Sequence, residues 1–150
     1  MNAAVVIAAI ALAAVNAVPA LIGSWRWYRC EPSRAFWIAL RVGQGAALLL
    51  AVGVGALAVA GDYSQERLFY LYALIPLAVA FVAEQLRVIS AQTILDRHGL
   101  DDAQAVGELA EDEQRQLVVS IVRREMGVMT LSALVVVFLA LRAAATAHGF

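Results

Sequence analysis

The chain has 150 residues, of which 63% are hydrophobic, and a formal net charge of only −1. A nucleic-acid-binding surface needs a concentration of basic residues, so this charge balance argues against a nucleic-acid partner. The length leaves room for one domain. The mean hydropathy of +0.78 indicates an integral membrane protein, whose first partner is the lipid bilayer.

Four apolar stretches occupy most of the chain. They predict transmembrane helices over residues 3–23, 35–60, 68–91 and 124–145, because about 20 apolar residues in a helix cross the hydrocarbon core with every backbone hydrogen bond satisfied. No positive charge precedes the first stretch, so we expect it to be a span and not a signal peptide. The predicted fold is all-α: a single integral membrane four-helix bundle.

The basic residues predict the orientation of the chain. All eleven are arginines, and nine follow the first span or lie between the third and fourth spans, whereas only Arg67 and Arg142 lie on the other side. This asymmetry follows the positive-inside rule. It predicts a multi-pass protein of the plasma (inner) membrane with both termini outside and the connections 24–35 and 92–122 in the cytoplasm.

The first span carries Asn16 and Pro19 near its cytoplasmic end, where the proline is expected to kink or end the helix. The connection that follows alternates aromatic and cationic residues, as is typical at lipid headgroups. The predicted headgroup contacts are Trp25, Arg26, Trp27, Arg29 and Arg34. They indicate either an ordinary interfacial belt, which we favour, or a specific anionic-lipid or phosphate site.

The second helix is expected to begin at Ser33, a typical N-cap residue. Small residues recur along it at every fourth position, which allows close approach of a neighbouring helix. The residues predicted to serve this packing are Gly43, Ala47, Ala51 and Gly55. The stripe fits packing within the bundle or between copies, and packing within the chain is the preferred interpretation.

The third helix is predicted to continue out of the membrane as far as Gly99, a typical C-cap residue. A short helix is expected around residues 102–109, and the last helix is expected to begin near Asp112. The third and fourth spans would thus form a cytoplasmic helical hairpin over about residues 92–123. Six acidic residues and no basic one between 101 and 113 predict an acidic, solvated surface on it.

Several polar residues are expected at one depth in the membrane, when each helix is measured from its outer end at about 1.5 Å per residue. This layer, a possible ligand or ion site, comprises Asn16, Arg41, Gln44, Glu84, Gln85, Arg87 and Glu125. An unpaired charge there is costly, so Arg41 is predicted to pair with Glu84 or Glu125, and Glu84 with Arg87 three residues on. The layer either fixes helix register, the preferred reading, or lines a polar cavity.

The reactive side chains argue against several cofactors. Cys30 is the single cysteine, which excludes intramolecular disulfide redox chemistry, and the absence of lysine excludes a lysine-linked retinal. His98 and His148 lie outside the spans, which argues against a bis-His haem. No catalytic or metal-binding motif is present, so we expect neither.

These observations favour a non-catalytic helical-bundle subunit that forms a homo-oligomer or serves with another membrane subunit. A small oligomeric transporter or channel that uses the polar layer is the alternative. A lipid-active membrane enzyme with Glu84 or Glu125 as general base is a further alternative, with less support because no activated nucleophile accompanies the arginines.

Overall fold

The chain is described by a computed structural model over residues 2–61, 67–100, 103–107 and 109–147. Within these ranges it is helical, without strands, which confirms the predicted all-α class. Its helices are α1 (Asn2–Arg29), α2 (Arg34–Val59), α3 (Arg67–Arg97), α4 (Ala103–Gly107) and α5 (Glu111–Thr146). Among these, α1, α2, α3 and α5 are long and apolar enough to cross a membrane.

The helix ends follow local sequence signals. Ser33 has extended backbone angles, and its hydroxyl accepts a 3.2 Å hydrogen bond from the amide of Phe36, as the predicted N-cap should. Gly99 has a φ of +67° two residues beyond the end of α3, where the amide of Leu100 donates to the carbonyl of Leu95. The third helix therefore ends in a cap at the predicted glycine. Residue 102, where the predicted short helix begins, lies outside the described residues.

Of the two effects predicted for Pro19, a kink or an end of the first helix, the end is wrong, because α1 continues through the proline to Arg29. The kink stays a prediction. A proline removes one backbone hydrogen bond, but the segment after it is held by other contacts. Ala20 is buried in a core cluster with Phe36 and Met129. Tertiary packing thus keeps the last turns of α1 helical.

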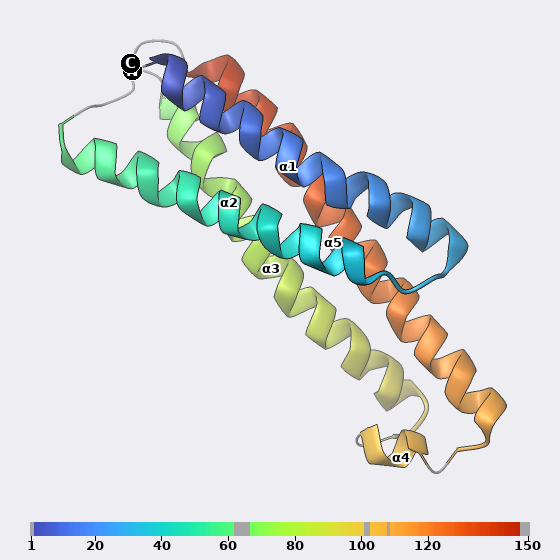
Figure 1. The fold of residues 1–150 in the computed structure, drawn as a ribbon. Helices are drawn as coiled ribbons and strands as arrows, with labels where there is room; N and C mark the ends of the chain where they lie inside the picture. The colour runs from blue at the N-terminus through green and yellow to red at the C-terminus, as the bar shows by residue number, and fades with distance from the viewer. Residues whose placement is uncertain (1, 62–66, 101–102, 108, 148–150) are drawn as a thin grey trace.

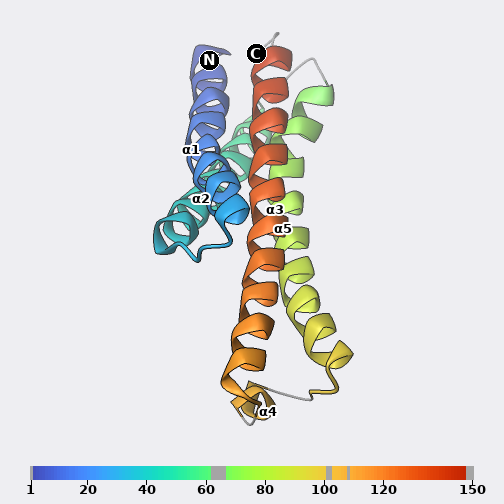
Figure 2. The same cartoon turned by 90° about the vertical axis from the view of Figure 1, so that its right-hand side faces the viewer.

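The helices are arranged around α5, which packs along both α1 and α3 (Figure 1). The second helix packs mainly on α1 and less on α3, and it crosses the others at an angle (Figures 1 and 2). The start of α1 and the end of α5 lie at the same end of the molecule. At the other end, α3 and α5 extend beyond α1 and α2 to the short α4 (Figure 2).

The buried core consists of three apolar clusters spaced along the helices. They centre on Phe36 and Met126, on Leu12 and Val136, and on Val54 and Phe69. In the most apolar window of each helix, 39% of the residues are buried in α1 and α5 but only 22% in α2 and α3. Most of the apolar surface of α2 and α3 therefore faces outward, as expected for contact with lipid or with another membrane protein.

Candidate functional site

Arg41 and Glu84 form the centre of a charged cluster between α2 and α3. The Arg41 Nη1 donates to Glu84 Oε1 at 2.6 Å and to Gln44 Oε1 at 2.7 Å. The amide of Gln44 also donates to Glu84 Oε1, at 2.9 Å. The Arg41–Glu84 pair predicted from helix depth is thus present, and Gln44, three residues from Arg41 on the same helix face, completes it.

Arg87 neutralises the second oxygen of Glu84. Its Nε lies 3.5 Å from Glu84 Oε2, one turn along α3, and its guanidinium carbon lies 5.1 Å from the ring centroid of Trp37. The contact with Trp37 is a cation–π interaction, which is attractive without requiring a hydrogen bond. Trp37 is absent from the predicted layer, although its position four residues before Arg41 places both on one face of α2.

The remaining members of the predicted layer do not join this network. Glu125 of α5 is partly buried and lies close enough to interact electrostatically with Arg87 and Glu84, yet within the described residues it has no ion pair. Gln85 is exposed on α3. The cluster Arg41, Gln44, Glu84 and Arg87 is called the charged cluster below.

Asn16 serves a separate contact between α1 and α2. Its side chain is buried, and its amide donates to the carbonyl of Leu12 at 3.0 Å and to the carbonyl of Gly43 at 3.4 Å. A Cβ atom at Gly43 would lie only 2.6 Å from the Asn16 Oδ1. The polar side chain and the glycine therefore fit together across the helix interface.

The small-residue stripe of α2 is only partly used inside the chain. Gly43, Ala47 and Ala51 are buried. Gly55 is exposed, and no heavy atom of the described residues outside its own helix lies within 4 Å of a Cβ built on it. Intrachain packing thus accounts for the first three positions and not for Gly55.

The connection after α1 carries its own internal charge pairing. Glu31 forms ion pairs with both Arg26 and Arg29, and the Arg29 guanidinium carbon lies 5.9 Å from the ring of Trp25. Arg34 is exposed at the start of α2. Sequence reasoning missed the role of Glu31, although it is the single acidic residue among these arginines.

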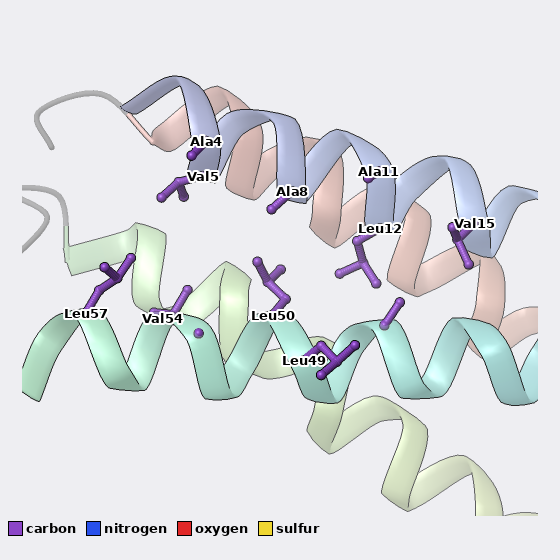
Figure 3. A pocket seen from close by; sticks show the side chains of 12 residues that line it. Ala4, Val5, Ala8, Ala11, Leu12, Val15, Leu49, Leu50, Val54 and Leu57 are labelled. Atoms are coloured by element: carbon purple, nitrogen blue, oxygen red, sulfur yellow. The ribbon is translucent and has the colours of Figure 1, made fainter. Parts of the chain in front are cut away.

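Two grooves flank α1. The first, of about 520 Å³, lies between α1 and α2, where Val5 faces Val54 and Leu12 faces Leu49 and Leu50 across an apolar gap (Figure 3). The second, called the arginine groove, has a volume of about 580 Å³ and lies between the end of α1 and α5. Its main lining residues are Trp27, Ser120, Arg123, Arg124, Val128 and Leu131.

The charged cluster lines none of five surface pockets, of about 360 to 580 Å³, that lie along the described residues. In the described part of the chain, no group of three His, Cys, Asp or Glu side chains is placed to bind a metal ion. The geometry of the cluster is that of an internal helix contact.

Comparison with known proteins gives no match to a protein-family model, to a curated protein or to a solved structure.

Proposed function

We propose that this chain is a non-catalytic, membrane-spanning helical-bundle subunit that associates with itself or with another membrane subunit. The observation that carries the proposal is the pairing within the charged cluster. Two arginines of the same chain, Arg41 and Arg87, neutralise Glu84. The amide of Gln44 also donates to Glu84, and the ring of Trp37 lies against Arg87. Charges paired in this way fix the register of neighbouring helices, and they leave few groups free to bind a ligand or to take part in a reaction.

The outward surfaces of α2 and α3 support association. In the most apolar window of each helix only 22% of the residues are buried, and Gly45 and Gly53 of α2 have no atom within 4 Å of a built Cβ outside their own helix, in the part of the chain that the structure describes. Small residues on an outer face let a second helix approach closely. In this proposal the distribution of arginines places the extension of α3 and α5 in the cytoplasm.

Site-specific photo-crosslinking in intact membranes tests this proposal. A photoreactive residue at Val52 of α2 or Phe81 of α3, both outward-facing, should give a defined homo-oligomer or one reproducible protein adduct. The matched control is Leu141 of α5, which is also exposed but lies on a helix of which more is buried, 39% of its most apolar window against 22% in α2 and α3, and it should give much less. Adducts with lipid alone at all three positions would contradict the proposal.

The alternative of an oligomeric transporter or channel is favoured by Glu125. This carboxylate lies beside the charged cluster without an ion pair among the described residues, as a side chain that binds a moving ion or proton would. Protein reconstituted in liposomes should then move a cation, an anion or protons, and Glu125→Gln should abolish that flux. The absence of any cation, anion or proton flux would exclude the transporter or channel alternative.

A further inference from the structure

We propose that the arginine groove binds one anionic phospholipid, whose phosphate is held by Arg123 and Arg124 and whose acyl chain lies along Val128 and Leu131. This inference is independent of the proposed function, since both catalytic and non-catalytic membrane proteins bind lipid. It rests on the charges in the groove, the order of polar and apolar residues along it, and its continuity with a second groove.

Arg123 and Arg124 carry the positive charge that the groove offers. Four of the nine arginines on this side of the molecule have a partner among the described residues: Arg26 and Arg29 pair with Glu31, Arg41 with Glu84, and Arg87 with both Glu84 and Trp37. By contrast, neither Arg123 nor Arg124 has an ion pair or side-chain hydrogen bond among the described residues.

Two adjacent, exposed arginines without a carboxylate partner suit a phosphate group. Guanidinium groups bind phosphate oxygens through charge-assisted, often bidentate hydrogen bonds. Basic pockets between helices at the membrane interface recognise anionic lipid headgroups by the same chemistry. The groove therefore lacks a negative charge to balance the two arginines, and the phosphate of a lipid would supply it.

The lining of the groove changes from polar to apolar along one face of α5. Gln116, Ser120 and Arg123 lie on the side of the extension, and Val128 and Leu131 lie toward the membrane-crossing part of the helix. The distance along the helix axis from Arg123 to Leu131 is about 12 Å, at about 1.5 Å per residue. A phospholipid has the same order of groups, with the phosphate followed by an apolar chain.

The apolar end of the arginine groove is shared with another groove. Val128 and Leu131 also line a pocket of about 460 Å³ between α3 and α5, together with Val82, Leu86 and Val135. That pocket is almost entirely apolar and follows α5 away from the arginines. An acyl chain that passes Leu131 thus has a continuous apolar surface on which to lie, whereas a free phosphate would use only the polar end.

Trp27 forms the wall opposite the arginines, and Gly127 makes room for it. A Cβ at Gly127 would lie 3.0 to 3.2 Å from the indole ring, so the ring lies directly on the α5 backbone. Tryptophan is typical of the headgroup level of a bilayer, because its ring is apolar and its N–H is polar. The wall therefore places the groove at the depth where a lipid phosphate lies.

The test is a titration of the full-length protein in detergent micelles with phosphatidylglycerol, followed by native mass spectrometry. The variant Arg123→Gln/Arg124→Gln should bind phosphatidylglycerol about 30-fold more weakly than the wild type, since each arginine near an anionic headgroup contributes about 1 kcal/mol. Phosphatidylcholine, which has no net charge, should bind both proteins equally weakly. Both variant side chains are exposed, so the fold is expected to survive, and circular dichroism checks this.

The matched control, Arg67→Gln/Arg97→Gln, removes the same charge from exposed positions outside the groove. It should change the affinity by less than about 2-fold, because charges at a distance are screened by salt. An equal loss in both double variants would overturn the proposal in favour of non-specific attraction. Unchanged affinity in the groove variant would overturn it as well.

Free glycerophosphoglycerol, the headgroup of phosphatidylglycerol without its acyl chains, distinguishes a lipid from a soluble phosphate compound. It carries the same phosphodiester but no acyl chain, so at an equal concentration it should not displace phosphatidylglycerol from the wild type. Displacement as complete as that by unlabelled phosphatidylglycerol would show that Val128 and Leu131 contribute nothing and would contradict the lipid assignment.

Discussion

At the scale of single residues, Glu84 and Glu125 differ in their hydrogen bonds and ion pairs. Both lie beside the same arginine, but Glu84 accepts hydrogen bonds from Arg41 and Gln44 and lies 3.5 Å from Arg87 Nε. Its side chain is 25% exposed, whereas that of Arg41 is 53% exposed, so solvent or headgroups screen part of the interaction. The stabilisation is therefore expected to be moderate.

Replacing Glu84 with alanine should lower the free energy of unfolding by about 1 to 2 kcal/mol, the lower part of the range for hydrogen bonds to charged groups. It removes both acceptor oxygens and leaves Arg41 and Arg87 without a carboxylate. Glu125→Ala is the matched control, because it removes a carboxylate from the same region that has no ion pair among the described residues. Equilibrium unfolding in mixed micelles gives both values.

The expected order is a clear loss for Glu84→Ala and a change within about 0.5 kcal/mol for Glu125→Ala. If Glu125→Ala is the more damaging substitution, the charged cluster is not the contact that holds α2 and α3 in register. That outcome would shift support to the transporter or channel alternative.

At the scale of elements, the small-residue stripe of α2 lies partly against α1 and partly on the outer surface of the bundle. Gly43 and Gly55 are three turns apart in the same stripe, but Gly43 is packed on Asn16 and Gly55 is exposed. The difference arises from helix geometry, because a four-residue repeat turns by about 40° per step around a helix of 3.6 residues per turn. Gly55 has therefore turned away from α1, although its neighbour Val54 is still buried in a cluster with Val5. The outer part of the stripe is left free for lipid or for another protein.

Gly43→Ala should destabilise the protein by about 1 to 3 kcal/mol, the usual cost of overpacking a close contact. The added methyl group would meet the Asn16 side chain at 2.6 Å. Gly55→Ala has open space in the described structure and should be neutral or stabilise slightly, because alanine is the better helix former. Thermal unfolding of the two variants in the same detergent measures the difference.

Equal melting temperatures for the two variants would contradict the Asn16–Gly43 contact. The double variant Asn16→Ala/Gly43→Ala adds a second check, because truncation of Asn16 makes room for the methyl group. The cost of Gly43→Ala should then fall in that background, which is the non-additivity expected of residues in contact.

The elements themselves were largely predictable from the sequence. Ser33 and Gly99 marked the ends of helices through the chemistry of capping, and hydropathy identified the four long helices. Pro19 was predicted to kink or end the first helix, and it does not end it, because the packing of Ala20 outweighs the local signal. Local rules cannot weigh such contacts, since they depend on which helices become neighbours.

The candidate site was predictable in part. Helix depth brought Arg41 and Glu84 to one level, and helix periodicity joined Gln44 and Arg87 to them. Two features were not predictable: the position of Gln85 on the outer surface and the arginine groove. They depend on the rotation of each helix about its axis and on the way α1 and α5 cross. The sequence of one chain determines neither the rotation nor the crossing by any local rule.

At the scale of the whole molecule, helix length determines what leaves the membrane. With 36 residues, α5 is about 54 Å long at about 1.5 Å per residue, against a hydrocarbon core of about 30 Å. The acidic residues Glu111, Asp112 and Glu113 are all in its first turn, at the far end beside α4 (Figure 2). In the proposed membrane arrangement, the surplus length would place this charged tip in water, where a partner could reach it.

The most direct test of the central claim, a non-catalytic subunit whose charged cluster is closed within one chain, is native mass spectrometry of the gently solubilised full-length protein. The account predicts a defined homo-oligomer or a complex with one other membrane subunit, carrying phospholipid and no other small molecule. A monomer that retains a specific non-lipid small molecule would contradict it, because such a ligand would require a functional site that the paired charges do not provide.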